Sequence, residues 1–220
     1  MAYIDFLSAI HKSTKRDYLG RVNEFPKAQA IKTAKKFDYD YWDGDRKFGY
    51  GGYRYDGRWK KVATALAEHY HLKPGDRILD VGCGKGFLLY DLTQVVPGIE
   101  ICGIDISEYA VGNAKEEIHK FLKVADAKSL PYRDSYFDLV ISINTLHNLY
   151  CYDLVSALKE IERVGKKNKY LVVESYRNEE EKVNLMYWVL TGECFFTPLE
   201  WEWFFKLAQY TGDYSFIYFE

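Results

Sequence analysis

The sequence predicts an α/β fold in which helices cover both faces of a mostly parallel sheet. Three observations indicate this fold. From residue 59 onward, short apolar runs alternate with segments of helical spacing, and a glycine-rich turn follows the first apolar run. Strands separated by helices of about 10–15 residues form right-handed βαβ units. Hydrophobic residues make up 48% of the 220-residue chain, which is enough for one buried core.

We expect two parts in the chain, an N-terminal helical cap with an aromatic lid at 1–58 and an α/β domain at 59–220. Apolar spacing predicts helix in much of 1–36. The following segment, 37–59, is dense in glycine and aromatic residues. Its glycines disfavour a regular element, so we expect a loop held in place by its aromatic rings.

Elements within 59–220 follow from apolar runs and helical spacing. Apolar runs predict strands at 77–83, 100–106, 123–127, 137–144, 169–175 and 213–220. Helical spacing predicts helices at 59–72, 87–96, 108–122, 151–164, 179–190 and 198–210. No strand is expected after 213–220, so this strand would leave an open sheet edge. An edge of this kind favours a homodimer, because a second copy could cover it.

Composition excludes several classes of protein. The chain has 30 basic and 32 acidic side chains, so it lacks the basic excess of a nucleic-acid binder. No apolar run approaches the roughly 20 residues of a membrane helix, and the N-terminus does not resemble a secretory signal. We therefore expect a cytoplasmic protein without a nucleic-acid or membrane partner. The four cysteines lack metal-ligand spacing, so no metal is expected.

Charge is unevenly distributed along the chain. Residues 1–61 contain 14 Lys or Arg and 8 Asp or Glu, a net charge of +6, so the remainder carries −8. A basic lobe beside an acidic body favours an anionic substrate. A solvated helical face is an equally good interpretation of the basic residues.

The turn after the first strand reads DVGCGKG, residues 80–86. Turns of this kind lie at the carboxyl edge of a parallel sheet, where ligands bind. Because Gly82 and Gly84 have no Cβ atom, the backbone can approach a ligand closely. The next strand ends at Asp105, where a carboxylate can accept hydrogen bonds from a ribose diol. Asp105 could instead cap the following helix, although Ser107 could serve as the cap.

These motifs resemble those of the class I S-adenosylmethionine-dependent methyltransferases, whose first motif reads much like ILDVGCGKG. The resemblance covers roughly 59–175 and extends to LPYRDSYFDLVISINTLHNL at 130–149, which is similar to the branch that acts on small molecules. It implies a Rossmann-like fold with S-adenosylmethionine as cofactor and S-adenosylhomocysteine as product. It also implies cofactor contacts by Asp80, Gly82, Gly84, Asp105, Ile106, Asp126, Ala127 and Asn144.

Within that resemblance, Asp80 would hold the methionine end of the cofactor, Asp105 the ribose and Asp126 the adenine amino group. Ala127 would offer its backbone N–H to the adenine, and Ile106 would press on the adenine face. Asp126 could alternatively cap its own loop.

Two residues are candidates for the methyl-transfer step. Asn144, at the end of the fourth strand, should point at the transfer site. His147 could remove a proton from the acceptor near neutral pH, or it could close the pocket by packing. Glu174, after the fifth strand, could bind an amine or hydroxyl of the substrate or cap the next helix.

Two parts of the chain supply candidate pocket residues, the aromatic segment 37–59 and a late aromatic run at 194–210. Tyr50, Tyr53 and Tyr55 could enclose the sulfonium by cation–π contact, and Arg54 or Arg58 could hold a carboxylate or phosphate. The alternative is an ordered surface loop pinned by its aromatic rings. Two residues of the late run are assigned to the substrate pocket, Phe196 and Trp201.

The sequence therefore predicts an S-adenosylmethionine-dependent methyltransferase that acts on an O or N atom of a small molecule. An anionic molecule is one option, which the basic N-terminal lobe favours. Two alternatives remain open at this stage, a nicotinamide-dependent oxidoreductase and a non-catalytic cofactor-binding domain. The third glycine comes one residue earlier than in the dinucleotide fingerprint, which weighs against the first alternative.

Overall fold

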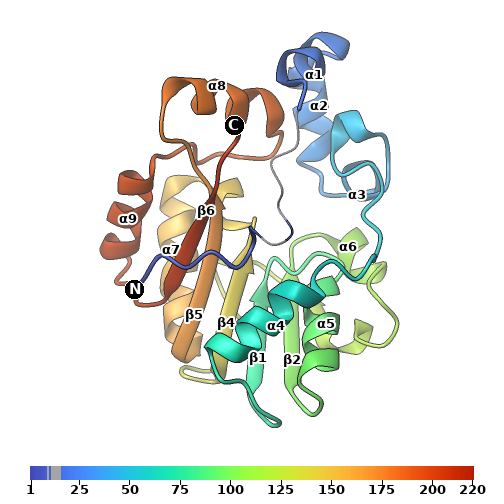
Figure 1. Cartoon of the computed structure of the whole chain (residues 1–220). Helices are drawn as coiled ribbons and strands as arrows, with labels where there is room; N and C mark the ends of the chain where they lie inside the picture. Colours follow the sequence, from blue (N-terminus) through green and yellow to red (C-terminus); the bar gives the residue numbers. More distant parts are fainter. Residues whose placement is uncertain (9, 11–15) are drawn as a thin grey trace.

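The computed structural model describes residues 1–8, 10 and 16–220, and its centre is a six-stranded parallel sheet (Figure 1). The strands lie in the order β3-β2-β1-β4-β5-β6, and each neighbouring pair is parallel. Their bounds are β1 Arg77–Val81, β2 Glu100–Asp105, β3 Leu122–Val124, β4 Phe137–Ile143, β5 Gly165–Glu174 and β6 Asp213–Ile217. The sheet is Rossmann-like, as the sequence predicts.

Helices surround this sheet. Their bounds are α1 Tyr18–Glu24, α2 Lys27–Ala34, α3 Tyr39–Trp42, α4 Lys60–His69, α5 Phe87–Val95, α6 Glu108–Gly112, α7 Cys151–Val164, α8 Glu179–Trp188 and α9 Pro198–Leu207. Three short 3-10 helices are η1 Arg46–Phe48, η2 His119–Phe121 and η3 Leu146–Asn148. No helix in the part of the chain that the structure describes is both long and apolar enough to span a membrane.

The two faces of the sheet bury alternate residues of each strand. Ile78 and Leu139 are paired in register and pack into the cluster formed with α4 and α5. Their neighbours Leu79 and Val140 point the other way, into the cluster formed with α7 and α9. All four side chains are fully buried, so this alternation holds the helices on opposite faces.

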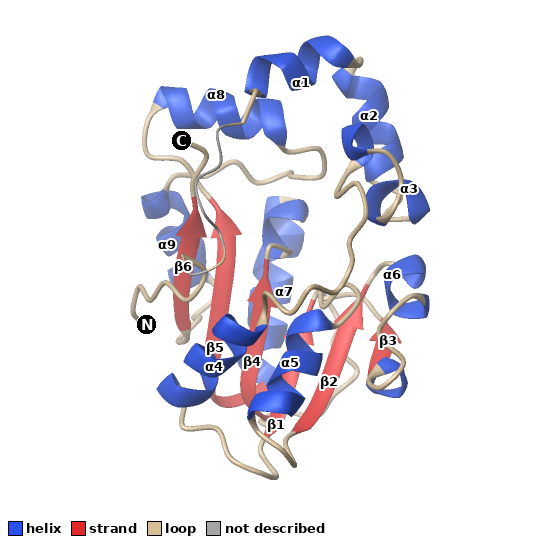
Figure 2. Ribbon diagram, turned by 45° about the vertical axis from the view of Figure 1, so that its right-hand side comes forward, coloured by secondary structure: helices blue, strands red, loops and turns tan. Residues whose placement is uncertain are grey.

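The helices α1, α2 and α3 lie beyond the carboxyl ends of the strands, where α1 packs against α8 (Figure 2). We call the described residues 16–58 the cap. Ala30 and Ala34 of the cap form a small apolar cluster with Leu190, which joins α2 to the chain after α8. The cap thus covers the edge at which a parallel sheet binds its ligands.

The N-terminus differs from the prediction. Instead of starting a helix, Tyr3 forms a parallel bridge to Tyr214 of β6. The Ile4 N–H donates to the Tyr214 carbonyl at 2.9 Å, and the Tyr214 N–H donates to the Ala2 carbonyl at 3.0 Å. Because the chain's own N-terminus covers this part of the β6 edge, the open-edge reason for expecting a homodimer is lost there. The helix expected over residues 9 and 11–15 falls outside the described residues.

Other differences are local. The helix expected at 108–122 ends at Gly112, because glycine stabilises helix poorly and Asn113 then leaves the helical conformation. The segment 37–59 contains the single turn α3 as well as η1, so its glycines do not exclude every short helix. β5 begins at Gly165, four residues earlier than expected.

Candidate active site

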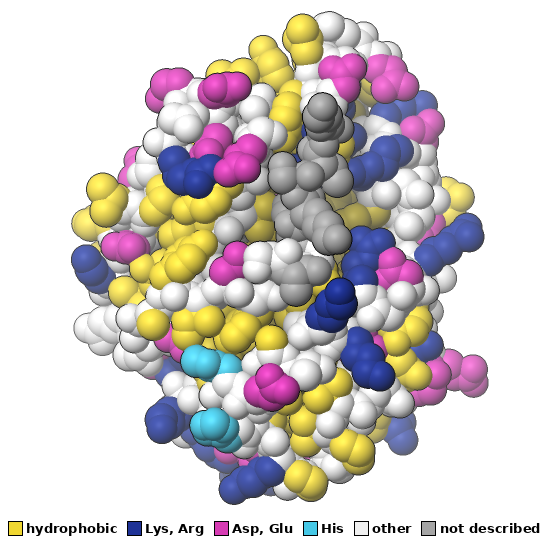
Figure 3. All heavy atoms as spheres, in the orientation of Figure 1, with side chains coloured by type: hydrophobic (Ala, Val, Ile, Leu, Met, Phe, Trp, Pro, Cys, Tyr) yellow, Lys and Arg dark blue, Asp and Glu magenta, His cyan; other side chains and the backbone are white. Residues whose placement is uncertain are grey.

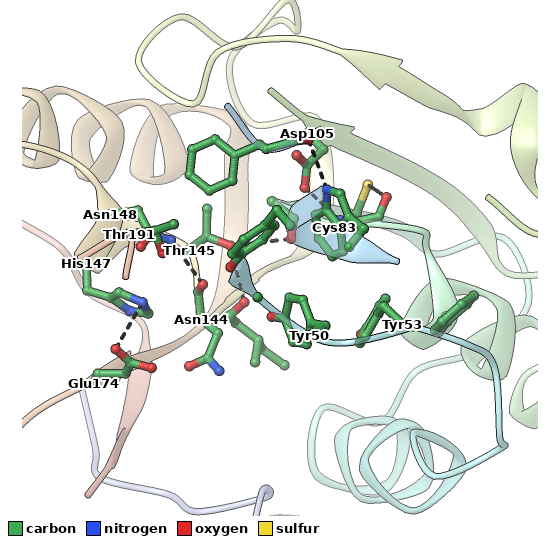
Figure 4. A pocket seen from close by; sticks show the side chains of 18 of the residues that line it. Tyr50, Tyr53, Cys83, Asp105, Asn144, Thr145, His147, Asn148, Glu174 and Thr191 are labelled. Atoms are coloured by element: carbon green, nitrogen blue, oxygen red, sulfur yellow. Dashed lines mark hydrogen bonds and ion pairs between the residues drawn. The ribbon is translucent and has the colours of Figure 1, made fainter. Parts of the chain in front are cut away.

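A cavity of about 690 Å³ lies between the cap and the carboxyl ends of β1, β2, β4 and β5. Its volume is within the range of small-molecule sites in proteins. Most residues that the sequence assigns to the site line it: Tyr50, Tyr53, Arg54, Arg58, Asp80, Gly82, Gly84, Asp105, Ile106, Asp126, Ala127, Asn144, His147 and Glu174. Figure 4 shows several of these side chains pointing toward one another.

The glycine turn brings backbone to the cavity wall where no side chain would fit. Gly82 has a φ of +81°, and a Cβ atom on it would lie 2.0 Å from the Thr145 hydroxyl oxygen. Gly84 has a φ of +54°, and its Cβ would lie 2.9 Å from the Trp42 ring. Both positions therefore require glycine for conformation and for space.

Asp105 shapes this turn through both carboxylate oxygens. One accepts the Gly84 N–H at 2.7 Å, and the other accepts the Ser107 N–H at 2.9 Å. The Ser107 hydroxyl caps α6 by accepting from Ala110, so Asp105 is not the helix cap. Each oxygen keeps acceptor capacity for a further donor from the cavity. Burial raises the pKa of Asp105, and the two backbone donors oppose that rise.

Two more carboxyl groups meet the cavity. Burial raises the pKa of Asp80 to about 7, and the nearby charge of Asp105 adds to the effect. A cationic ligand group beside Asp80 would favour its ionised form. Asp126 accepts the Lys128 N–H at 2.9 Å, so it does form the loop cap considered in the sequence, while it also lines the cavity.

The lid packs on the glycine turn through aromatic rings. Tyr53 stacks on Phe87 at a centroid distance of 4.9 Å, and Tyr50 stacks on Trp42 at 5.3 Å. Burial is the main cause that raises the pKa of Tyr50, to about 12. Both rings are thus held in place by neighbouring aromatic rings.

An ion pair that the sequence does not reveal fastens the lid to the turn. Lys85 is 5% exposed, and its ammonium group lies 2.8 and 2.6 Å from the two carboxylate oxygens of Asp43. The Tyr109 hydroxyl also donates to Asp43, at 2.8 Å. Because Asp43 and Lys85 are distant in sequence, no local sequence pattern predicts this ion pair. Asp43 directly follows Trp42 in the chain. The ion pair therefore helps to hold the Trp42 ring over Gly84.

On the other side of the cavity, His147 of η3 faces Glu174 at the end of β5 (Figure 4). The His147 Nε2 and a Glu174 carboxyl oxygen are 3.3 Å apart, with side chains 4% and 12% exposed. Burial lowers the pKa of His147 to about 3 and raises the pKa of Glu174 to about 8. Burial thus disfavours the charged form of both groups, which are close enough to share a proton at this contact. Asn178, and not Glu174, caps α8.

Buried polar atoms without a partner lie beside this pair. Asn144 Oδ1, His147 Nδ1 and Asn148 Oδ1 have no hydrogen-bond partner among the described residues. Such atoms are costly in a protein interior unless a ligand or water satisfies them. All three residues line the cavity, where a bound molecule or water would satisfy these atoms.

Asn144 also has an unusual backbone. Its φ is +58°, in the left-handed region, which asparagine tolerates better than most residues. We expect the free energy of unfolding of Asn144→Ala to be about 1 kcal/mol lower than that of Asn144→Gly. Both variants lose the amide, but only alanine is strained at a positive φ. Denaturant unfolding of the two variants tests this expectation. Equal midpoints, or a more stable alanine variant, would contradict a strained backbone at this position.

Three residues that the sequence assigns to the substrate do not line the cavity. The Tyr55 hydroxyl donates to Asp91 at 2.7 Å. Phe196 and Trp201 belong to the cluster between the sheet and α9. Trp201 is fully buried, and its indole N–H donates to the Glu174 carbonyl at 2.9 Å, so it supports the end of β5 from behind. Dense aromatic residues on a helix pack into the core when its inner face is apolar.

Comparison with known proteins identifies the family. A family model described as a methyltransferase domain matches residues 72–209, more than half of the chain. The chain belongs to the class I S-adenosylmethionine-dependent methyltransferases. Membership of this family argues against the alternative that the sequence left open, a nicotinamide-dependent oxidoreductase.

This member of the family is similar to proteins with different acceptors. It is 36% identical over 118 residues to the demethylmenaquinone methyltransferase of Symbiobacterium thermophilum, covering 50% of this chain and 46% of the relative. It is 34% identical over 130 residues to the tRNA (carboxymethyluridine(34)-5-O)-methyltransferase of Arabidopsis thaliana, covering 59% of this chain and 30% of the relative. The matches thus span less than half the length of either relative.

Solved structures agree in fold. The YcgJ protein of Bacillus subtilis superimposes with a TM-score of 0.55 at 21% identity, covering 67% of each chain. A chain in the complex between the Haloferax volcanii methyltransferase activator Trm112 and a methyltransferase gives a TM-score of 0.54 at 26% identity. That match covers 70% of this chain and 72% of the other.

The site fits S-adenosylmethionine, the methyl donor of the family. Asp105 keeps acceptor capacity at the end of β2, as a ribose diol requires. Gly82 and Gly84 leave bare backbone at the cavity wall, and Asp80 lies there with a raised pKa that a cationic group would lower. The residues present therefore suit a nucleoside with a charged amino-acid end.

Proposed function

We propose that this methyltransferase transfers a methyl group to an O or N atom of a small molecule enclosed beneath the cap. The main support is that the His147–Glu174 pair lines the same cavity as Asp105 and the glycine turn. S-adenosylmethionine supplies the activated methyl group when bound. The protein must then align the acceptor and remove its proton.

In this proposal the cofactor contacts divide among four places on the sheet edge. Asp80 binds the methionine end, and Asp105 accepts hydrogen bonds from the ribose hydroxyls. Asp126 and Ala127 bind the adenine edge. Ile106 packs on the adenine face. It lines the cavity and is 56% exposed, so it has apolar surface available for a ligand to cover.

The acceptor side is formed by Asn144, His147 and Glu174. We assign proton removal to Glu174 in its ionised form, with His147 holding the carboxyl group in place through Nε2. The unpartnered Asn144 Oδ1 is suited to accept a hydrogen bond from the acceptor's hydroxyl or amine. His147 is then a positioning residue, because its lowered pKa leaves it a weak base.

A small acceptor is favoured over tRNA by the enclosure of the site. Trp42, Tyr50 and Tyr53 cover the cavity from the lid and pack tightly on one another. An acceptor beneath them is shielded from water, which suits an enclosed small molecule better than a folded nucleic acid. The chain's net charge of −2 also offers no general attraction for a phosphate backbone.

Calorimetric titration with S-adenosylhomocysteine, with NAD as the control ligand, tests the cofactor. A screen that measures S-adenosylhomocysteine release from S-adenosylmethionine then compares small phenols, amines and hydroxy acids with tRNA. We expect binding of S-adenosylhomocysteine but not NAD, and turnover with a small acceptor. Turnover with tRNA alone would overturn the small-molecule proposal, and cofactor binding without turnover on any acceptor would support a non-catalytic domain.

A further inference from the structure

Three arginines from separate parts of the cap meet around one tryptophan. Trp188 is the last residue of α8. The guanidinium carbons of Arg16, Arg21 and Arg46 lie 5.0, 4.5 and 5.1 Å from the centre of its ring. Arg16 also lies 5.0 Å from the centre of the Phe219 ring. Stacking on aromatic rings holds guanidinium groups in place while leaving their edges free for hydrogen bonds.

Other contacts fix two of these arginines without neutralising them. Arg21 Nε donates to the Trp188 carbonyl at 3.2 Å, and another Arg21 nitrogen donates to the Arg46 carbonyl at 3.3 Å. Arg46 donates to the Gly49 carbonyl. These acceptors are neutral backbone groups, so the positive charges remain unbalanced.

No carboxylate pairs with the three arginines within the described ranges, in contrast to Arg58, which pairs with Asp56, and Arg177, which pairs with Glu181. Residues 9 and 11–15 are Ala, His, Lys, Ser, Thr and Lys, so the sequence outside those ranges contains no acidic side chain. Glu24 acts on Arg21 only at long range.

The charge concentration has a measurable consequence. Burial and the neighbouring Arg46 lower the pKa of Arg21 to about 10. Burial, and to a smaller extent Arg16, lowers the pKa of Arg46. Repulsion between like charges in a partly buried place is unfavourable. A bound anion would reduce this repulsion. Lys and Arg side chains are also frequent on the side of the molecule that carries the cap (Figure 3).

The arginines belong to the same cavity as the proposed transfer site. Arg16, Arg21, Arg46 and Trp188 line it together with Glu174. The charge of Arg16 opposes the rise in the pKa of Glu174, so the two groups are close enough to interact. A single molecule could therefore reach both places.

We propose that Arg16, Arg21 and Arg46, grouped around Trp188, bind an oxyanion of the methyl acceptor. This inference rests on the proposed function and adds the class of acceptor, a small molecule that carries a carboxylate or phosphate as well as a hydroxyl or amine. Guanidinium groups match both anions because each presents parallel N–H donors to paired oxygens. The anion orients the acceptor, so that its nucleophile lies beside Glu174 and Asn144.

Site-resolved chemical modification tests the subsite in the wild-type protein. Phenylglyoxal reacts with uncharged guanidine groups, so Arg21 should react faster than Arg133, which is exposed and far from the cavity. Mass spectrometry follows each residue with chloride, pyrophosphate or benzoate at equal ionic strength. We expect one of the two oxyanions to protect Arg21 and Arg46 and to leave Arg133 unchanged. Equal reaction of Arg21 in chloride and in both oxyanions would overturn the proposal.

Variants give an independent measure. We expect Arg21→Gln and Arg46→Gln each to weaken binding of the protective anion by about tenfold, the value of one lost charge-assisted hydrogen bond. Arg133→Gln, the matched control, should bind it like the wild type. If Arg21→Gln fails to fold, Arg21→Lys keeps the charge and the stem but loses the planar fork, and it should still bind more weakly. Unchanged affinity in the folded variants would contradict the subsite.

The two proposals fail in different ways. Protection by pyrophosphate indicates a phosphate-bearing acceptor, and protection by benzoate indicates a carboxylate. S-adenosylhomocysteine binding is measured separately and should be the same in the arginine variants as in the wild type. If the wild type binds S-adenosylhomocysteine but neither oxyanion, only the acceptor class is wrong. If it binds oxyanions but not S-adenosylhomocysteine, the proposed function is wrong.

Discussion

Asp105→Ala should bind S-adenosylhomocysteine at least about 100-fold more weakly than the wild-type protein. In our proposal the carboxylate accepts hydrogen bonds from two ribose hydroxyls. Hydrogen bonds to charged groups contribute about 1.5–3 kcal/mol each, so losing two accounts for this factor. The same oxygens accept the Gly84 and Ser107 N–H groups, and alanine would also free the glycine turn. Calorimetry at one pH and salt concentration measures the change.

Two further variants separate these effects. Asp105→Asn keeps one carbonyl oxygen for a backbone donor but loses the charge, so its affinity should fall between those of the wild type and Asp105→Ala. Asp134→Asn is the matched control, because Asp134 is exposed and pairs with Arg163 on the surface. Its affinity should equal that of the wild type. An Asp105→Ala protein that melts normally and binds S-adenosylhomocysteine with full affinity would refute the assignment.

Glu174→Gln should lower kcat/KM by about 100-fold or more, the usual contribution of a positioned general base. Burial raises the pKa of Glu174 to about 8, so the wild-type carboxyl is mostly protonated near neutral pH. Only its ionised form accepts a proton. The wild-type rate should therefore rise with pH until about 8, and the residual rate of Glu174→Gln should lack this rise. Glu180→Gln, on the exposed start of α8, is the control.

The same substitution should change how stability depends on pH, a measurement that needs no acceptor. Because the pKa of Glu174 is raised from 4.5 to about 8 on folding, the folded state keeps a proton that the unfolded chain releases. Stability from this group is present below pH 4.5 and is lost as the pH rises toward 8.

Glutamine cannot ionise and escapes that loss. The unfolding free energy of Glu174→Gln, relative to the wild type, should thus increase with pH over this window, by at most about 1.4 kcal/mol per unit. Denaturant titrations at several pH values give this difference. A difference that stays constant with pH would mean that the carboxyl group titrates normally, and the proposed base would lose its physical support.

Local patterns in the sequence were sufficient for the central fold. The β1 and β2 runs are mostly apolar because both faces of their sheet are buried, and this property is visible in each strand by itself. The glycine turn and Asp105 follow from chain position alone, since a turn after a parallel strand must lie at the carboxyl edge. For the same reason Asn144 and Glu174, at the ends of β4 and β5, were predicted to lie near the site.

Contacts between residues that are distant in sequence could not be predicted from such local patterns. Phe196 and Trp201 look like pocket residues in a linear pattern, yet Trp201 on α9 and Phe196 just before that helix pack into the core cluster. Ile4, Leu7 and Ile10 have helical spacing, but residues 2–4 extend along β6, because hydrogen bonds to Tyr214 are available there only after the sheet has formed. Tertiary contacts override local preference in such segments.

The sequence by itself determined the class of fold, the family and the edge of the sheet that binds ligands, because each depends on residues close together in the chain. Only the tertiary structure brought His147 to Glu174, Asp43 to Lys85, and the three arginines to Trp188. Those contacts join segments tens of residues apart or more. Their pKa values and charge balance depend on burial between such segments, a property that exists only once the chain has folded.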